Sequence, residues 1–468
     1  MGKQFYTLKN IKRIHMIGIG GVSMSAMALV LKKEGYEITG SDKSEGDMIE
    51  ILRENQIPVL IGSNAELVKH ADIVVYTSAI NQHDPEFVRA KALGIPTFER
   101  AKFLGLLLKC YDSPICVCGT HGKTTTTSML SSIFIDAGLD PNVQIGGKFR
   151  KLNNLNYRIG ESEYFILESC EYVDSFLNFP HTTATVLNID EDHLDYFSGI
   201  EEIKSSFKKF ILMLPKNGIL VFNKDDLNCC DVVNEIADEL VNNQIRVFTF
   251  SLSDPTATLY AQNVSCNIKG FYSFDVFDKN TGKSYGFYLT VPGIHNVYDA
   301  LAAITTSYAY GIDFTVMQKS LSEFCGAKRR FEYKKTLKND ILVYDDYAHH
   351  PTEIKATLSA AKQKEHKRII AVFQPHTYSR TKELLSDFAG SFKDADIAII
   401  ADIYAAREID EGIVSSQDLV NEINKISHNA IFIKDFENIA QYLKENMKKG
   451  DLILTIGAGD ITHLSELL

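Results

Sequence analysis

The chain has 468 residues, about the length of three average domains. Its composition, with 45% hydrophobic and 23% charged residues, excludes a mostly disordered chain, a collagen-like chain and a small disulfide-stapled scaffold. The formal net charge is -11, from 49 basic and 60 acidic residues, so no global basic field attracts nucleic acid or an anionic membrane.

Several features favour a cytoplasmic protein, either a monomer or a homodimer. The longest apolar runs, such as Phe103–Leu108, fall short of the roughly 20 residues that a membrane-spanning helix needs, so we expect no membrane insertion. The first residues lack the apolar core of a signal peptide. The eight cysteines are too few for a disulfide framework, and neither Cys116 with Cys118 nor Cys229 with Cys230 has the C-x-x-C spacing of zinc and redox motifs.

The first hundred residues alternate short apolar runs with helical patterns. The predicted strands are Arg13–Ile17, Glu37–Gly40 and Asp72–Thr77, and the first predicted helix is Met24–Lys33. This alternation indicates a parallel sheet with helices on its faces. The polar segment Lys109–Pro114, which ends in proline, predicts a linker and closes a first domain at residues 1–111.

The middle third continues with a strand at Ile115–Cys118, a glycine-rich loop and a helix that extends to about Asp136. Between Val247 and Val291 the pattern changes to short β segments with glycine and asparagine turns, which predicts an antiparallel part. The other strands expected are Tyr164–Leu167, Ala184–Asn188 and Ile219–Phe222, and the later helices are Asn296–Tyr310 and Thr315–Phe324. A second linker is predicted at Gly326–Arg330.

The last 140 residues resume the strand–helix alternation, with one helix starting after Pro351. The expected strands are Ile341–Tyr344, Ile369–Phe373, Ile397–Ala401, Ala430–Ile433 and Leu452–Ile456. The predicted fold is α/β with three domains, at residues 1–111, 112–326 and 327–468. The first and last domains are Rossmann-like, and the central one is a P-loop-type ATPase sheet with an antiparallel part.

A first glycine-rich turn, Gly18–Ser23, lies between a predicted strand and a helix. It matches the first two glycines of G-x-G-x-x-G, with serine in the third place. Gly18 permits a tight turn and Gly20 a close backbone approach, so the helix N-terminus faces an anion such as a pyrophosphate. Asp42 follows the second strand, where a dinucleotide-binding fold places its ribose acid. Alone, this pattern suggests a nicotinamide cofactor, or a purely structural turn with a surface aspartate.

A second loop, Gly119–Thr125, carries a stronger signal. It ends in Gly-Lys-Thr like a P-loop, but Val117 stands where the usual spacing requires glycine, so the loop is two residues shorter. Its backbone N–H groups and the helix dipole would hold phosphate oxygens, Lys123 would reach the β- and γ-phosphates, and the Thr124 hydroxyl would bind Mg²⁺. The loop therefore predicts an ATP site.

Acidic residues follow two strands of the same predicted domain. Glu168 and Glu171 end one strand, and the run Asp190–His193 follows another. Ligands gather at the carboxyl ends of parallel strands, where the phosphate loop also lies, and Mg²⁺ prefers hard oxygen ligands. The alternative for each acid is a solvated loop charge.

Five motifs in this order resemble those of the Mur ligases, the ATP-dependent ligases of peptidoglycan precursor synthesis. They are Gly119–Thr125, Asp190–His193, Gly293–Asn296, Arg329–Phe331 and Asp345–Pro351. Within that family the chain is most similar to the members that add L-alanine. That similarity lies in the N-terminal Gly-Ile-Gly-Gly-x-x-Met-Ser, Thr77–Ile80, Asp345–Glu353 and Gln374–Thr381. The resemblance extends from about residue 11 to residue 460.

The resemblance implies a role for each matching residue. Lys123, Glu168 and His193 are implied to be catalytic, and Thr124, Glu168 and His193 to bind Mg²⁺ directly or through water. The residues implied to bind ATP are Gly119, Thr120, His121, Gly122, Lys123, Thr124, Thr125, Asn296, Arg330 and Asp346. The residues implied to bind the UDP-sugar are Gly18, Gly20, Gly21, Ser23 and Ser78, and those implied to bind the amino acid are Tyr347, His349 and Arg380.

The implied reaction joins the lactyl carboxylate of UDP-N-acetylmuramate to the amine of L-alanine, with ATP forming ADP and phosphate through an acyl phosphate. The first domain would bind the UDP-sugar, the second ATP and the third the amino acid. Two departures bear on this: Thr377 stands where many relatives carry arginine, and Glu168–Ser175 is less acidic than in many relatives. The alternatives are a ligase that attaches a preformed tripeptide in cell-wall recycling, a nicotinamide-dependent oxidoreductase, and a nucleotide-binding regulator without catalysis.

Overall fold

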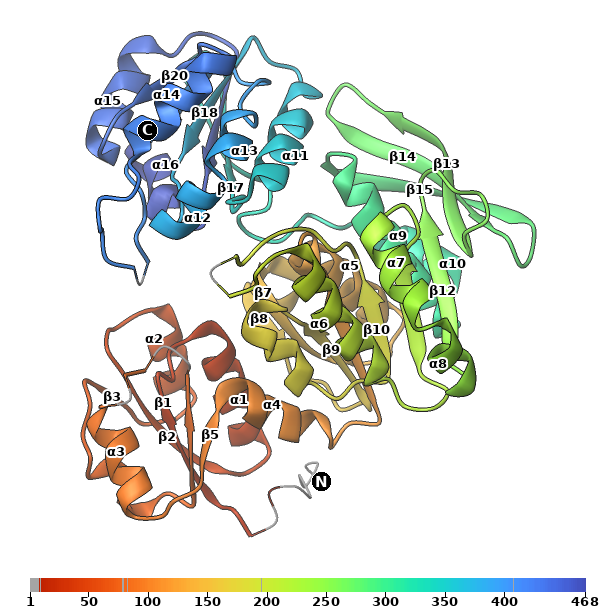
Figure 1. Ribbon diagram of the computed structural model, residues 1–468, viewed down its shortest axis with the longest axis vertical. Coiled ribbons are helices and arrows are strands. Elements are labelled where there is room, and N and C mark those ends of the chain that lie inside the picture. Colours follow the sequence, from red (N-terminus) through yellow and green to blue (C-terminus); the bar gives the residue numbers. More distant parts are fainter. Residues whose placement is uncertain (1–7, 9, 78–79, 82, 195, 407) are drawn as a thin grey trace.

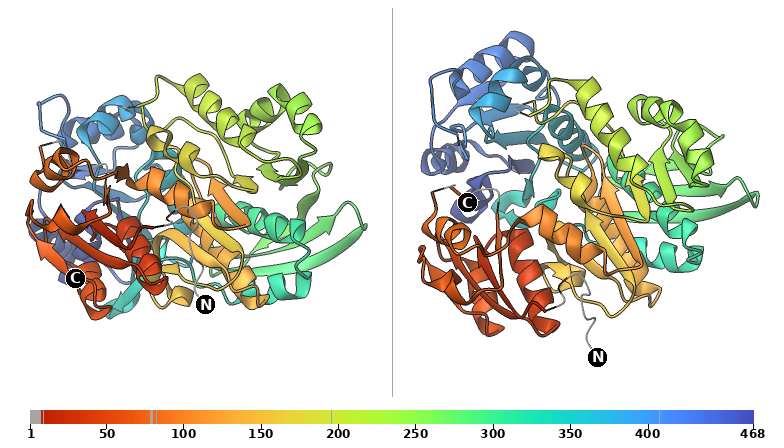
Figure 2. Two further views of the ribbon diagram at one scale, coloured as in Figure 1. Left: turned by 90° about the horizontal axis from the view of Figure 1, so that it is seen from below. Right: turned by 60° about the horizontal axis from the view of Figure 1, so that its bottom comes forward.

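The computed structural model describes residues 8, 10–77, 80–81, 83–194, 196–406 and 408–468. The described strands form three sheets that follow one another along the chain, with helices between the strands (Figure 1). The last three strands of the middle sheet, within residues 259–292, lie on the side of the molecule away from the N-terminal sheet (Figures 1 and 2). The α/β fold with three such units confirms the predicted fold class.

The N-terminal sheet has five parallel strands in the order β3-β2-β1-β4-β5. Its strands are β1 (Arg13–Ile17), β2 (Glu37–Asp42), β3 (Val59–Ile61), β4 (Ile73–Tyr76) and β5 (Thr97–Glu99). Its helices are α1 (Val22–Lys33), α2 (Asp47–Glu54), α3 (Pro85–Ala92) and α4 (Arg100–Leu108). The order reverses beside β1, and this reversal places the turn after β1 at the crevice where open α/β sheets bind ligands.

The middle sheet has ten strands in the order β15-β14-β13-β12-β11-β10-β6-β9-β7-β8. They are β6 (Ser113–Cys118), β7 (Asn142–Phe149), β8 (Leu155–Arg158), β9 (Tyr164–Glu168), β10 (Thr183–Val186), β11 (Ile219–Asn223), β12 (Arg246–Ser251), β13 (Leu259–Cys266), β14 (Phe271–Asp278) and β15 (Lys283–Pro292). Strands β13 to β15 pair antiparallel, as predicted, and β7 with β8 forms a third antiparallel pair. The helices are α5 (Lys123–Asp136), α6 (Ile200–Leu212), α7 (Leu227–Glu235), α8 (Ala237–Asn242), α9 (His295–Ala309) and α10 (Phe314–Ser322).

The C-terminal sheet has six strands in the order β16-β17-β21-β18-β19-β20, of which only the edge strand β16 is antiparallel. They are β16 (Glu332–Leu337), β17 (Ile341–Asp346), β18 (Arg368–Phe373), β19 (Ile397–Ile400), β20 (Ala430–Phe432) and β21 (Asp451–Ile456). The helices are α11 (Pro351–Lys362), α12 (Tyr378–Glu383), α13 (Leu385–Ala389), α14 (Ser416–Ile426), α15 (Phe436–Asn446) and α16 (Leu464–Leu467).

The proposed domain boundaries fall between these sheets. Residue 111 lies between α4 and β6, and residue 326 lies between α10 and β16. The expected linker Lys109–Pro114 is shorter in the structure, because β6 already begins at Ser113 and Pro114 pairs with Phe165 of β9. Proline fits there because it stands near the start of the strand.

Helix α5 positions the phosphate loop because it is almost wholly buried in the middle domain, with α9 packed beside it. Its run of threonines and serines would be costly to bury unpaired. Each of Thr127, Ser128, Ser131 and Ser132 donates its hydroxyl to the backbone carbonyl four residues earlier. The helix therefore carries its polar side chains inside the core, with its N-terminus at the loop.

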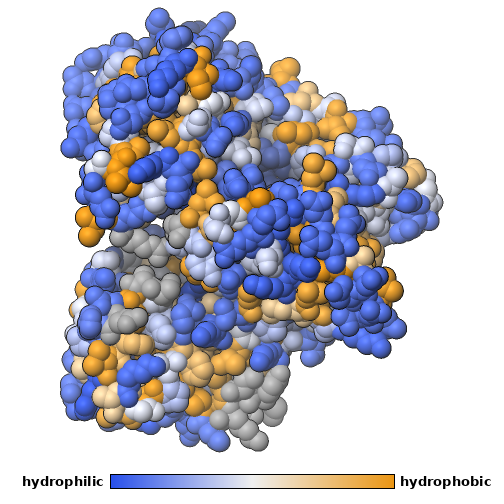
Figure 3. Space-filling view, viewed as in Figure 1, coloured by the Kyte–Doolittle hydropathy of each residue, from blue (hydrophilic) through white to orange (hydrophobic). Residues whose placement is uncertain are grey.

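Hydrophilic residues cover much of the face seen in Figure 3, and apolar ones are scattered among them. Over the described residues, no helix combines the length and the apolar character that crossing a membrane requires.

Candidate active site

The loop between β6 and α5 has a backbone that only glycine adopts easily. Gly119 has φ +142° and Gly122 has φ +83°, both in the left-handed region. The loop is held from the neighbouring strand by Asn188, whose backbone oxygen accepts from the Thr120 N–H (3.2 Å) and whose side-chain oxygen accepts from the His121 N–H (2.8 Å). These contacts fix the loop at the N-terminus of α5, and a glycine-rich loop in that position is an arrangement that binds phosphate groups.

Lys123 reaches back over this loop. Its Nζ donates to the carbonyl oxygens of Gly119 (2.5 Å) and Thr120 (2.9 Å) and lies 3.2 Å from Oε2 of Glu171. Burial alone would lower the pKa of Lys123, but the Glu171 carboxylate raises it above its ordinary value. Lys123 is therefore a fixed positive charge at the loop, and Glu171, itself only 2% exposed, is its counterion.

Thr124 and Glu168 lie together beside the loop. The Thr124 hydroxyl donates to Oε1 of Glu168 (2.9 Å), and the Gly146 N–H donates to Oε2 (2.6 Å) and orients the carboxylate. This pair of adjacent hard oxygens fits the ligand preference of Mg²⁺. His193 lies in the neighbouring loop, where it stacks on Tyr172 with a ring-centroid distance of 4.5 Å, and burial lowers its pKa.

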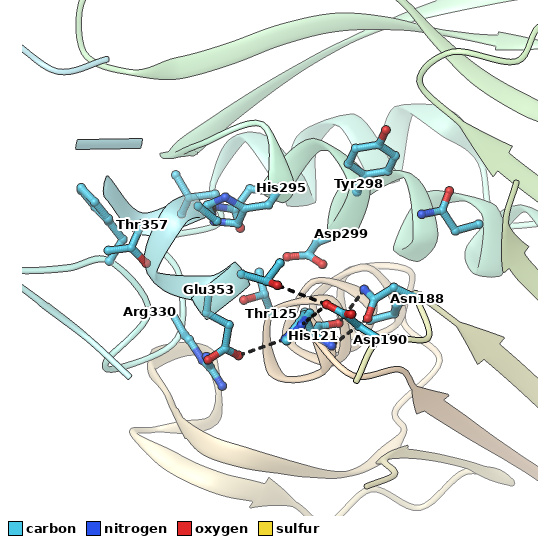
Figure 4. Close-up of a pocket in the computed structure, with 18 of the residues that line it drawn as sticks. His121, Thr125, Asn188, Asp190, His295, Tyr298, Asp299, Arg330, Glu353 and Thr357 are labelled. Carbon is cyan, nitrogen blue, oxygen red and sulfur yellow. Dashed lines mark hydrogen bonds and ion pairs between the residues drawn. The ribbon is translucent and has the colours of Figure 1, made fainter. Parts of the chain in front are cut away.

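A cavity of about 410 Å³ adjoins the loop, between the middle and C-terminal domains (Figure 4). The predicted ATP-site residues that line it are His121, Gly122, Thr125, Asn296, Arg330 and Asp346. Asp346, at the end of β17, accepts hydrogen bonds from the N–H groups of Phe331 (2.7 Å) and Ala348 (2.8 Å). Burial raises the pKa of Asp346 to about 6, although the Arg330 guanidinium opposes that rise.

His121 connects the two domains that form this cavity. Its Nε2 lies 3.2 Å from Oδ2 of Asp190, and its Nδ1 lies 3.5 Å from Oε1 of Glu353 at the start of α11 (Figure 4). Thr352 also donates to Asp190 (3.1 Å). Burial alone would lower the pKa of His121, but the two carboxylates raise it to about 9. Among the described residues, the one group of three or more His, Cys, Asp or Glu close enough to share a metal ion is His121, Asp190 and His350.

A second cavity, of about 260 Å³, collects the residues predicted to receive the amino acid. Tyr347, His349 and Arg380 line it together with His193, Asp192 and Thr377. Two guanidinium nitrogens of Arg380 contact Oδ1 of Asp192, at 3.3 and 3.1 Å. Burial lowers the pKa of His349 to about 4, so its imidazole is neutral at neutral pH.

A third cavity, of about 720 Å³, lies in the N-terminal domain along the first glycine turn. Gly18, Gly20 and Gly21 line it, and the Gly20 N–H donates to Oδ2 of Asp42 (2.8 Å). Asp42 therefore stabilises the glycine turn through this hydrogen bond. Ser23, predicted to bind the UDP-sugar, is not among its lining residues; its hydroxyl accepts a hydrogen bond from Nε2 of Gln144 at 2.6 Å. Ser78 lies outside the described residues.

Two further residues reach these cavities without a sequence pattern that predicts it. Lys148 extends from β7 of the middle domain to the third cavity, where its Nζ lies 2.8 Å from Oδ2 of Asp47. No local pattern marks a lone lysine after two glycines as a ligand. Glu353 contacts His121 of the phosphate loop, and in the sequence its His-Pro-Thr-Glu run indicates only the capping box that starts α11.

Three domain profiles match the chain in order. They are "Mur ligase family, catalytic domain" at residues 13–111, "Mur ligase middle domain" at 117–307 and "Mur ligase, glutamate ligase domain" at 329–459. The chain belongs to the Mur ligase family. This Mur ligase is an ATP-dependent enzyme, and the loop that suggested a nicotinamide cofactor belongs to the matched family domain.

Curated relatives and solved structures cover nearly all of this Mur ligase. The UDP-N-acetylmuramate–L-alanine ligase of Caldanaerobacter subterraneus subsp. tengcongensis is 49% identical over 98% of this chain and 97% of its own. The enzyme of that name from Clostridium tetani is 46% identical over 99% of both. The crystal structure of the UDP-N-acetylmuramate-alanine ligase from Thermotoga maritima superposes with a TM-score of 0.80, at 26% identity over 98% of both chains. A murein peptide ligase from Psychrobacter arcticus shares the fold, with a TM-score of 0.71 at 24% identity over 97% of both.

Proposed function

We propose that this Mur ligase joins L-alanine to the lactyl carboxylate of UDP-N-acetylmuramate in peptidoglycan precursor synthesis, with ATP forming ADP and phosphate. The observation that carries the proposal is its 49% identity, over nearly the whole chain, to a relative named for that reaction. Three cavities support it, because the residues predicted to bind ATP, the amino acid and the UDP-sugar line a different cavity each. The smallest cavity, of about 260 Å³, suits the smallest substrate.

The chemistry explains why a phosphate loop is needed. A carboxylate is a poor electrophile. Transfer of the γ-phosphoryl group of ATP to one oxygen of the lactyl carboxylate makes an acyl phosphate, whose phosphate is a good leaving group. The amine of L-alanine then attacks the carbonyl carbon, and the tetrahedral intermediate expels phosphate to leave the amide. Lys123 and the N–H groups at the start of α5 would stabilise the negative charge on the transferring group, which is positioning and electrostatics rather than covalent catalysis.

The residues around Thr124 fit a magnesium ion. Thr124 and Glu168 place two oxygens 2.9 Å apart beside the loop, and the Gly146 N–H holds the carboxylate in position. In the proposed site these two residues would bind Mg²⁺, and His193 would bind it directly or through a water molecule. Bound there, Mg²⁺ would neutralise charge on the phosphate oxygens.

Arg380 is the proposed receptor for the α-carboxylate of L-alanine. It is paired with Asp192 in a cavity shared with Tyr347 and His349, and guanidinium groups bind carboxylates in a fork geometry. Because the His349 imidazole is neutral, it adds no second positive charge beside Arg380 and can accept a hydrogen bond from the amine of L-alanine. Thr377 adds no cation to this cavity, so Arg380 supplies the carboxylate contact.

We place the reaction in the cytoplasm, where ATP and nucleotide sugars are made. All eight cysteines are free thiols, as expected in a reducing compartment. The sister reaction, attachment of a preformed tripeptide to the same sugar, remains the alternative because it would use the same nucleotide and sugar sites.

One assay separates these functions: phosphate release from MgATP and UDP-N-acetylmuramate, with either L-alanine or the L-Ala-D-Glu-diamino-acid tripeptide added. We expect release that needs the sugar and L-alanine and that is lost in Lys123→Ala. Release with the tripeptide alone would assign the recycling reaction. Nucleotide binding without release in either mixture would indicate a regulator.

A further inference from the structure

Asp299 is a buried acid that no part of the proposed reaction uses. It lies on α9, one turn after Asn296, and lines the 410 Å³ cavity. Figure 4 shows its carboxyl group between α9 and the loop that carries His121 and Thr125. The contact with the loop is close, since a Cβ on Gly122 would collide with the Asp299 carboxyl group.

The surroundings of Asp299 provide little to stabilise a negative charge. Among the described residues, its one hydrogen bond comes from the Thr126 hydroxyl to Oδ1, at 3.0 Å. It forms no ion pair there, and the two cations that face it are engaged elsewhere. His121 is held between Asp190 and Glu353, and Arg330 contacts the Thr124 hydroxyl at 3.4 Å.

The other titratable groups around the cavity do not supply a counterion. On its own helix, His295 is half-buried, and desolvation lowers its pKa to about 4, so it is neutral. The other titratable residues that line the cavity, apart from His121 and Arg330, are acids or a tyrosine and bring no positive charge: Asp190, Asp226, Tyr298, Asp346 and Glu353. Burial raises the pKa of Asp299 itself to about 7, and the Thr126 hydroxyl and the facing cations only partly oppose this. Near neutral pH the carboxyl group is therefore close to the balance between its two forms.

A nucleotide changes that balance. Its phosphates bring negative charge to the loop that Asp299 touches, and an ionised carboxylate there would repel them. A neutral carboxylic acid in the same place is a hydrogen-bond donor. Oδ1 already accepts from Thr126, which leaves Oδ2 to carry the proton.

We propose that Asp299 binds the nucleotide as a neutral acid: molecules in which it is ionised take up a proton from solvent on binding, and the carboxylic acid donates a hydrogen bond to a phosphate oxygen. The inference rests on the proposed function, because it needs ATP on the Gly119–Thr125 loop. It adds a binding residue to that site and makes nucleotide affinity depend on pH. The proton comes from the buffer, and no covalent bond other than O–H forms.

Calorimetry measures this proton directly. MgADP is titrated into the full-length protein at pH 7.5 in phosphate and in Tris, whose ionisation enthalpies differ, and the difference in heat gives the number of protons taken up. The first variant, Asp299→Asn, keeps a hydrogen-bond donor but has no group that titrates. The second, Asp299→Leu, has neither a donor nor a titrating group. The matched control is Asp313→Asn, an aspartate that caps the start of α10.

We expect the wild-type protein and Asp313→Asn to take up the same fraction of a proton, about half or more, since the pH is near the pKa. Asp299→Asn should lose this uptake and keep its affinity within about threefold, because its amide still donates. Asp299→Leu should bind about tenfold or more weakly. Between pH 7 and 8.5, wild-type affinity should fall by about tenfold while that of Asp299→Asn stays flat. Ionisation of the nucleotide itself cancels between variants.

Proton uptake that is unchanged in Asp299→Asn would overturn the inference. If that uptake then disappears in His295→Gln, the proton is bound by His295 and not by Asp299. Should Asp299→Leu fail to fold, as judged by its circular dichroism and thermal melt, the comparison of Asp299→Asn with Asp313→Asn decides alone. Failure of MgADP to bind the wild-type protein would refute the proposed nucleotide site, which distinguishes that failure from failure of the proton linkage.

Discussion

Lys123 and Glu171 form a buried ion pair at the phosphate loop, with Nζ 3.2 Å from Oε2. The same ammonium group donates to two carbonyl oxygens of its own loop, at 2.5 and 2.9 Å. Glu171 thus keeps the lysine folded over the loop in the direction from which phosphate oxygens approach. The pair lies within one domain, so it forms independently of any domain movement.

This pair predicts graded losses of activity. Lys123→Ala removes the positive charge, and we expect kcat for phosphate release to fall by about 100- to 1000-fold, as for other groups that stabilise transition-state charge. Glu171→Gln keeps the shape but not the counterion, and we expect a fall of about tenfold through a less ordered Lys123. Wild-type turnover in Glu171→Gln would show that the pair does not position the lysine.

Glu168 and Thr124 predict the magnesium requirement. Glu168→Gln and Thr124→Val each remove one proposed ligand, so the Mg²⁺ concentration for half-maximal activity should rise by about 10- to 100-fold. Thr124→Ser keeps the hydroxyl and should remain near wild type. A titration of activity against Mg²⁺ at saturating ATP makes the comparison. An unchanged midpoint in Glu168→Gln would remove this carboxylate from the metal site.

Lys148 predicts a selective effect on the UDP-sugar. It lines the N-terminal cavity from the middle domain, so Lys148→Ala should raise KM for UDP-N-acetylmuramate by about tenfold and leave KM for ATP and L-alanine nearly unchanged. The matched variant Arg380→Ala should instead raise KM for L-alanine. Steady-state kinetics with each substrate varied in turn provides the values. An equal rise in all three KM values for Lys148→Ala would indicate a structural defect only.

His121 predicts how the contact between the middle and C-terminal domains depends on pH. Its pKa in the folded protein, about 9, lies above its ordinary value of 6.5. A raised pKa means that the contribution to stability is complete below about pH 6.5 and is lost as the pH rises through about 9. We expect on the order of 2 kcal/mol from the charged contacts at pH 6.

Thermal unfolding of the wild-type protein and His121→Gln at pH 6, 8 and 9.5 checks this dependence. The difference between their unfolding temperatures should be largest at pH 6 and should shrink towards pH 9.5. Asp190, whose pKa is lowered to about 2, stays ionised across this range and adds no slope of its own. A difference that is constant with pH would contradict the charged pairing of His121 with Asp190 and Glu353.

The parts of the fold that the sequence predicts are those with strong local patterns. Ile115–Cys118 is an apolar run bounded by proline and glycine, and it forms the last four residues of β6. The edge strands β3 and β5 went unpredicted because each has three residues, too few to show an alternating pattern. The β7–β8 pair was missed because the Gly146–Gly147 step interrupts its apolar pattern.

The candidate site divides in the same way. The phosphate loop is contiguous in sequence, so its glycines, Lys123 and Thr124 could be identified from spacing and from the family resemblance. Lys148, Asp299 and Glu353 approach from other elements, and only the folded chain brings them to their cavities. Burial also decides the ionisation of Asp299, and no sequence pattern shows burial of one acid on a helix.

The central claim, ligation through an acyl phosphate, is tested most directly by following oxygen atoms. UDP-N-acetylmuramate labelled with oxygen-18 in both lactyl carboxylate oxygens reacts with MgATP and L-alanine. The masses of the phosphate and of the amide product are then measured by mass spectrometry. Phosphoryl transfer to the carboxylate followed by amide formation leaves one labelled oxygen in the released phosphate and one in the amide product. Unlabelled phosphate, or product formation without L-alanine, would contradict the proposed reaction.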